Sequence, residues 1–222
     1  APYTFSYTLD GGVIQTVVSD LSGVAILTQS AVLAGTFIYD LVSVSDASAT
    51  ACSQSQTGTA TVTVNPLPTA TIGSDATVCV GDGSPVITFT GANGTAPYIF
   101  TYSINGGSNQ TIVSNVGGAA FISVSTGAAG TFSYDLVSVS DASATACSQS
   151  QSGTATVIVN PLPMAMIGTD ATVCTGSPDV PITLTAVNGQ APYTFSYTLN
   201  GGVVQTVVSD LSGSATLTQS AV

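Results

Sequence analysis

Any chemistry in this chain has to come from cysteine, aspartate and tyrosine. The 222 residues contain four Cys, eleven Asp and eight Tyr, and no Lys, Arg, His, Glu or Trp. Proton transfer near neutral pH most often uses histidine, glutamate or lysine, all of which are missing. The sequence also has no Gly-rich phosphate loop, nucleophile elbow or spacing typical of zinc ligands. We therefore predict that the protein is not an enzyme and needs no cofactor.

Calcium is the one cofactor that the aspartates could bind. Calcium prefers carboxylate and carbonyl oxygens, but the chain has no D-x-[DN]-x-[DN]-G loop and its carboxylates are scattered. We interpret Asp135 and Asp141 as solvated strand or turn residues, with a calcium site as the alternative.

The net charge excludes two classes of partner. Every charged side chain is negative, giving a formal charge of −11 at pH 7. Nucleic-acid binding needs a basic surface, and an anionic membrane repels an acidic one. No apolar run approaches the roughly 18 residues of a spanning helix, so we predict no membrane insertion. The first residues, APYTF, read as the middle of a strand, and we expect the chain to be a segment of a longer protein.

The residues that could do chemistry recur at a fixed spacing. The stretch YDLVSVSDASATACSQSQ occurs at 39–56 and again at 134–151, and APYTFSYTLDGG at Ala1 returns in close variants at Ala96 and Ala191. The cysteines obey the same shift of 95 residues, from Cys52 to Cys147 and from Cys79 to Cys174. A period of this length is a whole domain rather than a solenoid repeat.

The NPLP tetrapeptides mark the domain boundaries. Two prolines in each fix φ and remove backbone donors, which favours an extended, semi-rigid linker. The predicted linker residues are Asn65, Pro66, Pro68, Asn160, Pro161 and Pro163. We predict a partial domain at 1–65, a complete domain at 66–160 and a partial domain at 161–222.

Short strands with period-2 patterns fill the complete domain, and no segment favours a helix. The predicted strands are 69–72 (continued at 77–80), 84–90, 98–104, 109–114, 120–125, 131–140 and 154–160. About seven strands in 95 residues is typical of an immunoglobulin-like β-sandwich, so the predicted fold class is all-β with tandem sandwiches. We expect Ile87 and Phe89 to share one face, and the aromatics of 98–102 to point into the core. The Leu136–Val137 step breaks the alternation and predicts a bulge.

Tyr39 and Tyr134 precede the end of the strand that would be strand F. Either could form a tyrosine corner, in which the hydroxyl bonds the backbone. The alternative is an ordinary core tyrosine.

Two cysteines in each unit of an exported chain favour disulfides over thiol chemistry. We reject Cys52–Cys79, because these residues would lie at far ends of neighbouring domains. Our preferred pairing is Cys79–Cys147 within one unit, with Cys52 and Cys174 paired to residues outside the chain. Strand counting raises an objection, because it places Cys79 and Cys147 at opposite ends of the sandwich, and bridged Cα atoms must come within about 7 Å. The competing arrangement, each F–G loop bonded to the preceding domain, stays open.

The series NPLPTATIGSDATVCVGDGSPVITFTGANGTAPYIFTYSINGG, followed by GTFSYDLVSVSDASATACSQSQSGTATVIVNP, resembles tandem Ig-like or PKD-like repeats. Such repeats build very large surface adhesins and filaments that gliding Bacteroidota export by type IX secretion. The resemblance covers the whole chain and implies an extracellular, cell-surface location, a sandwich fold and an intradomain disulfide.

The predicted function is structural: a repeat segment of a surface stalk or fibre that gives reach and stiffness. Its partners would be neighbouring repeats of the same chain, and identical chains side by side in a fibre. The alternative function is a module that binds carbohydrate or another surface, with a surface glycan as partner.

Overall fold

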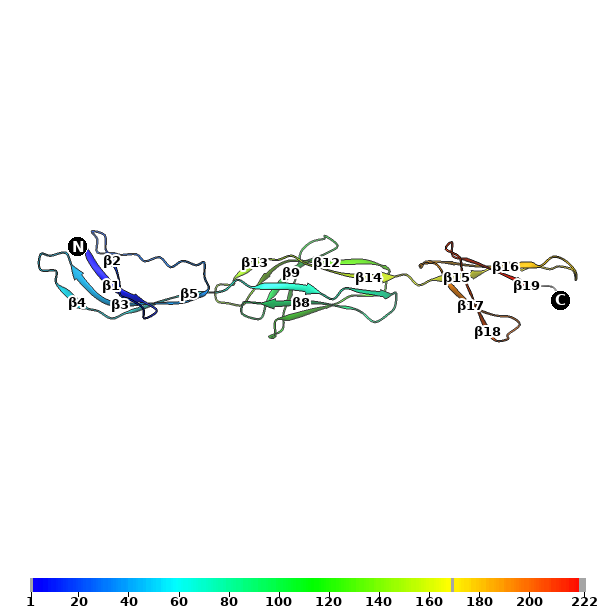
Figure 1. Cartoon of the computed structure of the whole chain (residues 1–222), viewed down its shortest axis with the longest axis horizontal. Helices are drawn as coiled ribbons and strands as arrows, with labels where there is room; N and C mark the ends of the chain where they lie inside the picture. Colours follow the sequence, from blue (N-terminus) through cyan, green and yellow to red (C-terminus); the bar gives the residue numbers. More distant parts are fainter. Residues whose placement is uncertain (1, 169, 220–222) are drawn as a thin grey trace.

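The computed structural model describes residues 2–168 and 170–219, and every regular element in that part of the chain is a β-strand (Figure 1). No helix there is long and apolar enough to cross a membrane. We call residues 66–160 the central unit, and the segments before and after it the N-terminal and C-terminal units.

The central unit is a sandwich of two sheets. Its strands are β6 (Thr69–Gly73), β7 (Ala76–Cys79), β8 (Val86–Ala92), β9 (Ile99–Ile104), β10 (Gln110–Val113), β11 (Ala119–Ser123), β12 (Gly130–Ser140), β13 (Ser148–Ser150) and β14 (Thr154–Asn160). One sheet has the order β11-β8-β6 and the other β10-β9-β12-β14-β7, with β13 also paired to β12. All pairs are antiparallel except β14 with β7. The predicted β-sandwich is confirmed, with β13 as an addition to the predicted strands. The predicted continuation of the first strand at 77–80 is the separate strand β7, which joins the other sheet by pairing with β14.

The two sheets enclose one core made of their inward-facing side chains. Phe89 of β8 stacks on Phe100 of β9 with ring centroids 5.5 Å apart, and both are fully buried. The predicted inward faces of β8 and β9 are confirmed, because Ile87, Tyr98 and Tyr102 are also buried. All members of this core lie between residues 70 and 159, so the central unit has a hydrophobic core of its own.

Two local predictions are also confirmed. The register of β12 against β9 shifts between Leu136 and Ser138, which is the predicted bulge. The turn after β9 has Asn105 at φ 51° and Gly106 at φ 68°, as its Asn-Gly sequence predicts. The Asn105 side chain then accepts a hydrogen bond from the Ser133 amide at 2.8 Å, which fixes the turn against β12.

The N-terminal unit has one sheet. Its strands are β1 (Tyr3–Leu9), β2 (Gln15–Val18), β3 (Gly35–Asp46), β4 (Ser53–Ser55) and β5 (Thr59–Val64), in the order β2-β1-β3-β4 with β5 also paired to β3. These strands repeat the β10-β9-β12 sheet of the central unit, with β5 in the place of β14. Residues 24–28, at the position of β11, form no strand.

The C-terminal unit contains the counterpart of the smaller sheet of the central unit, which the described part of the N-terminal unit lacks. Its described strands are β15 (Met164–Ile167), β16 (Val180–Val187), β17 (Thr194–Thr198), β18 (Val204–Val208) and β19 (Ser214–Gln219). The sheet β15-β16-β19 repeats β6-β8-β11, while β17 and β18 pair only with each other in the described residues. Figure 1 shows this two-stranded pair hanging away from the other sheet.

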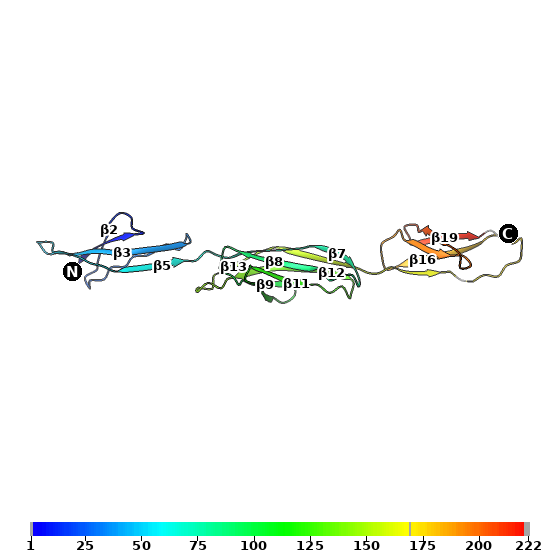
Figure 2. The ribbon, with the colours of Figure 1, turned by 90° about the horizontal axis from the view of Figure 1, so that it is seen from below.

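The three units stand end to end along one line, seen in two perpendicular views (Figures 1 and 2). The two NPLP segments cross between them, after β5 and after β14, and no sheet pairing in the described residues crosses either segment. The side chain of Asn65 donates a hydrogen bond to the Thr145 hydroxyl of the central unit at 2.9 Å. The division into domains at these positions stays a prediction.

Candidate functional sites: the open apolar faces and the junctions between units

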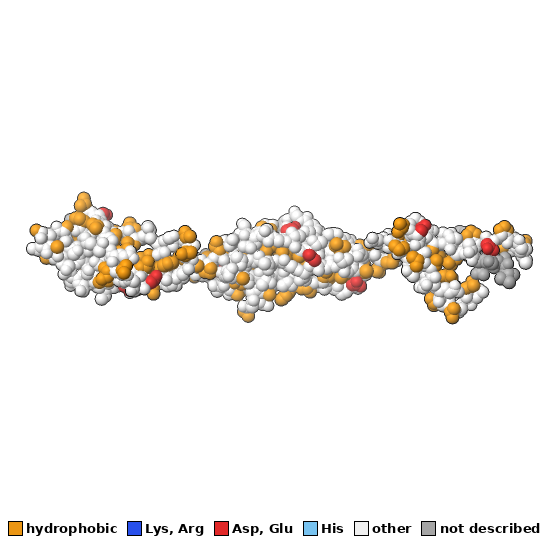
Figure 3. Space-filling model, in the orientation of Figure 1, with side chains coloured by type: hydrophobic (Ala, Val, Ile, Leu, Met, Phe, Trp, Pro, Cys, Tyr) orange, Lys and Arg blue, Asp and Glu red, His pale blue; other side chains and the backbone are white. Residues whose placement is uncertain are grey.

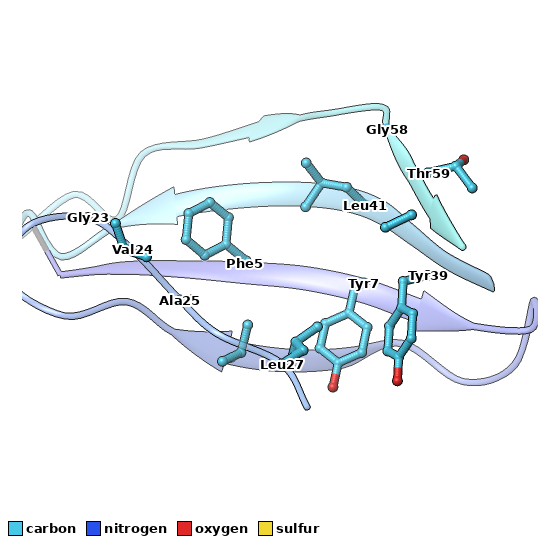
Figure 4. Close-up of a pocket in the computed structure, with 12 residues that line it drawn as sticks. Phe5, Tyr7, Gly23, Val24, Ala25, Leu27, Tyr39, Leu41, Gly58 and Thr59 are labelled. Carbon is cyan, nitrogen blue, oxygen red and sulfur yellow. The ribbon is translucent and has the colours of Figure 1, made fainter. Parts of the chain in front are cut away.

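The most apolar hollow of the N-terminal unit lies on the inner face of its single sheet (Figure 4). Its volume is about 590 Å³, and Phe5, Tyr7, Leu27, Tyr39 and Leu41 are among the residues that line it. No carboxylate lines it, and the Tyr7 hydroxyl is already bonded to the Gln15 side chain at 3.1 Å. The hydroxyl-bearing residues that line this surface are Tyr7, Tyr39 and Thr59, and no carboxylate or thiol lies beside them to form a catalytic pair.

The same positions in the central unit are buried core. Phe5, Tyr7 and Leu41 lie 95 residues before Phe100, Tyr102 and Leu136, which are 0%, 7% and 4% exposed. The hollow is therefore the inner face of a sandwich on which no second sheet is packed, rather than a pocket shaped for a ligand.

A second hollow, of about 710 Å³, lies in the C-terminal unit. It is lined by the inner face of β16 and β19, through Ile182 and Leu217, and by Tyr197 of β17. In the central unit the corresponding surface is covered by β12 and β14. The two hollows are thus opposite halves of one sandwich interface.

The tyrosine corner lies at a residue that the sequence did not single out. The Tyr98 hydroxyl donates to the Gly94 carbonyl at 3.0 Å and accepts from the Gly94 amide at 3.1 Å, four residues upstream. Two glycines make room for the ring, because a Cβ would lie 2.5 Å from it at Gly91 and 3.2 Å from it at Gly118. A Cβ at Gly94 would instead lie 2.8 Å from the Asp141 carboxylate. The glycines before and after the APY motif could have indicated this contact. The alternation of the strand predicted only that Tyr98 is buried in the core.

The two tyrosines predicted as corners behave differently. The Tyr39 hydroxyl donates to the side chain of Gln29 instead of a backbone carbonyl. Tyr134 is 5% exposed, belongs to the buried core and stacks on Tyr102 with centroids 6.5 Å apart. Burial raises the pKa of Tyr134, with the neighbouring Tyr102 adding to the effect. These contacts are those of a core tyrosine, and the corner at Tyr134 stays a prediction.

Asp141 is buried, so its prediction as a solvated residue was wrong. It is 5% exposed and accepts hydrogen bonds from the Ser143 hydroxyl at 2.7 Å and the Thr95 amide at 3.1 Å. Burial opposes ionisation, but these hydrogen bonds outweigh it and lower the pKa of Asp141 below its ordinary value of 3.8. Asp141 therefore fastens the loop that begins at its position to the loop before β9.

Asp135 accepts a hydrogen bond from the Thr154 hydroxyl at 2.7 Å and is half-buried. Within residues 2–168 and 170–219 no three Cys or Asp side chains come together as metal ligands would. Asp135 and Asp141 thus act as acceptors for nearby hydroxyls and amides.

No two of the four cysteines are bonded to each other in the structure. Cys79 lies beside Asn160, at the end of the central unit where Gly130 begins β12. Cys147 lies at the other end, beyond Ser140, where β12 finishes against β13. The ten residues between Gly130 and Ser140 span about 33 Å at ~3.3 Å each, far beyond a disulfide. The structure thus places the two residues of the predicted Cys79–Cys147 bond at opposite ends of the sandwich, which argues against this pairing.

The linker residues differ in their contacts. Pro68 is fully buried against the central unit, while Pro66 and Pro161 are exposed. Asn65 directly follows β5, whereas Asn160 is the last residue of β14. Pro163 lines a hollow at the second junction together with Cys79.

No protein-family model matches the chain, and no curated protein matches it. Among solved structures, it aligns with a Ca²⁺-stabilised adhesin by which an Antarctic bacterium binds ice, at 16% identity and a TM-score of 0.38. The alignment covers 98% of this chain and 56% of that one. It also aligns with a 1.5-MDa bacterial ice-binding adhesin, at 16% identity and a TM-score of 0.41, over 99% of this chain and 75% of that one. The chain thus spans little more than half the length of the first structure. Scores this low establish neither a shared fold nor a shared function.

Proposed function

We propose that the chain is a segment of an extracellular stalk or fibre of a bacterial surface adhesin or filament, in which it supplies reach and stiffness. The observation that carries the proposal is the end-to-end arrangement of three units in one line (Figure 2). Successive domains placed this way extend a chain with little bending.

The first junction supports stiffness. Its linker is short, and Pro66 and Pro68 hold fixed φ angles. Pro68 is fully buried, and the Asn65 side chain reaches the Thr145 hydroxyl at 2.9 Å. A unit held by both a buried proline and a side-chain hydrogen bond has less freedom to swing than one on a flexible linker.

The surface is suited to an exposed extracellular position. Figure 3 shows scattered carboxylates and no basic side chain among apolar and neutral atoms. Trypsin-like proteases cleave after Lys or Arg, and the chain has neither. Like charges spread along a rod also keep parallel copies from collapsing onto one another at low ionic strength.

The alternative, a carbohydrate-binding module, needs exposed aromatic side chains on which a sugar can pack. In the central unit, which is fully described, Phe121 on β11 is the single aromatic among the exposed large hydrophobic residues, at 57% exposure. One isolated ring is a poor platform, so the stalk is favoured.

Small-angle X-ray scattering of the chain in solution tests the proposal. Three units of about 35 Å each give a rod of about 100 Å, with a radius of gyration near 30 Å. A compact protein of this length would have a radius of gyration of about 17 Å. A value close to the compact figure would contradict the stalk, and a specific glycan-array signal lost on Phe121→Ala would favour the binding module.

A further inference from the structure

We propose that the cysteines form disulfides across the junctions: the Cys79-type cysteine of one unit bonds the Cys147-type cysteine of the unit that follows. Each junction of the repeat would then be stapled covalently. The inference depends on units following one another as they do here, and does not depend on the stalk function.

Cys147 lies at the junction with the preceding unit. Its sulfur is 3.2 Å from the Thr145 hydroxyl oxygen, and this hydroxyl accepts the hydrogen bond from the Asn65 side chain at 2.9 Å. Asn65 is the first residue of the first linker and directly follows β5. Cys147 is thus separated from the end of the preceding unit by one threonine side chain.

Cys79 lies beside the equivalent asparagine of its own unit. Asn160 is the counterpart of Asn65, 95 residues later, and it is the register partner of Cys79 in the parallel pair of β14 and β7. The Val80 amide donates to the Asn160 carbonyl at 2.9 Å, which continues this pairing. Neighbouring strands are about 4.8 Å apart.

These two placements meet at one asparagine. The asparagine that ends a unit has the Cys79-type residue on the adjacent strand, and it contacts the threonine two residues before the Cys147-type residue of the next unit. The two cysteine types therefore lie at the same junction, one on the strand beside this asparagine and the other beside the threonine that the asparagine contacts.

The second junction has a hollow where the second cysteine would sit. The hollow has a volume of about 340 Å³ and is lined by Cys79, Asn160, Pro161, Pro163, Gly189, Gln190 and Tyr193. Cys79 faces this space and is exposed.

The central unit shows which segment covers the equivalent surface. Thr95 is the counterpart of Gln190. Both the amide and the carbonyl of Thr95 are hydrogen-bonded to the start of the loop that contains Cys147. The Thr95 amide donates to Asp141 at 3.1 Å, and the Ala142 amide donates to the Thr95 carbonyl at 2.8 Å. A loop of this type in the C-terminal unit would enter the hollow and bring its cysteine to Cys79.

The bond forms by thiol–disulfide exchange with a small-molecule or protein disulfide as oxidant. One cysteine thiolate attacks that disulfide and releases one thiol, and the second cysteine then displaces the other. Two protein thiols lose two protons and two electrons, and one oxidant disulfide becomes two thiols.

The experiment uses the full chain extended at its C-terminus by a second copy of residues 128–160, which completes the third unit and adds one cysteine. The protein is equilibrated with reduced and oxidised glutathione, its thiols are alkylated, and peptic peptides are mapped without reduction. We expect Cys79 bonded to the added cysteine and three free thiols of five, at Cys52, Cys147 and Cys174. A bond from Cys174 to the added cysteine, or five free thiols, would overturn the proposal.

Two matched serine variants of the extended chain separate the pairings. Cys147→Ser should leave Cys79 bonded, whereas Cys79→Ser should leave all four remaining thiols free. Equal thermal melting of both variants in reducing buffer shows that neither is misfolded. A free Cys79 in the Cys147→Ser variant would contradict the proposal, because it would mean that Cys147 is the partner.

Discussion

Each flanking unit contains only part of the strand set of the central unit, and the strands that they share with it differ in what they bury. Val157 of β14 is fully buried, while Val62, at the same position of β5, is 37% exposed. The strand itself forms in both places, because its backbone partner β12 or β3 is present. What is missing around Val62 is the facing sheet. Hydrogen bonding thus decides whether these strands form, and the opposite sheet decides whether their side chains are buried.

The two flanking units also show which strand connects the larger sheet. In the central unit β12 bonds both β9 and β14, so it lies in the middle of that sheet. The N-terminal unit contains the equivalent strand, β3, and its sheet holds together. In the C-terminal unit no described strand takes this place, and β17 and β18 stand apart as a pair. Strand β12 is therefore the organising element of the repeat.

The largest expected effect on stability is that of truncating the phenylalanine that the three units share. Phe100 is fully buried, so Phe100→Ala should lower the free energy of unfolding of the central unit by about 3–5 kcal/mol. Phe5→Ala, on the open face, should cost about 1 kcal/mol. Denaturant unfolding, with hydrogen exchange to assign each transition to a unit, measures both. Equal losses would mean that the facing sheet does not control burial.

A smaller effect is expected from filling the space around Tyr98. In Gly91→Ala the new Cβ would lie 2.5 Å from the Tyr98 ring, so the central unit should lose about 1–3 kcal/mol. The C-terminal unit has Ala186 at this position, and its Tyr193 is less buried. Ala186→Gly is the matched control and should change stability by no more than about 1 kcal/mol. An unchanged melting temperature for Gly91→Ala would show that Tyr98 is not held by its glycines.

Much of the central unit could be predicted from the sequence, because its information is local. Alternation placed Phe89 and Phe100 in the core, and the break at Leu136–Val137 marked the bulge. The environments of Asp141 and Tyr98 could not be predicted in this way. Asp141 contacts Thr95, 46 residues away, and Tyr98 bonds the backbone of the loop that precedes its strand. The alternation of apolar residues within a strand contains no information on either contact.

The pairing of the cysteines could not be predicted from the sequence for a different reason. Counting strands from the sequence already placed Cys79 and Cys147 at opposite ends, but pairing within a unit was preferred because it needs no second domain. The structure adds the hydrogen bond from Asn65 to Thr145, which no spacing in the sequence reveals.

Asp141 gives a pH-dependent effect. Its pKa is lowered in the folded state, so it stabilises the central unit above its ordinary pKa of 3.8, and this contribution is lost as the pH falls through the folded value. Asp141→Asn cannot accept from the Thr95 amide through its NH₂ group, and should cost about 1–2 kcal/mol at pH 7. Thermal melts from pH 7 to pH 2 should show the two proteins converging below pH ~4. A constant gap at all pH values would argue against this role.

The smallest expected effect is that of calcium. Because no described group of side chains could hold a metal, millimolar calcium or EDTA should leave the melting temperature within about 1 °C. A rise of several degrees with calcium, absent with magnesium, would show that carboxylates come together in solution in a way that the structure does not contain.

Hydrogen exchange of β9 and β17 tests most directly the claim that β12 organises the repeat, since these strands are sequence counterparts and, in the described residues, only β9 is paired with such a strand. We expect β9 amides to exchange about 100-fold more slowly than β17 amides in the native chain. Extending the chain with a second copy of residues 128–160 should slow β17 to nearly the rate of β9. Equal protection of the two strands before the extension, or no change in β17 after it, would contradict the account.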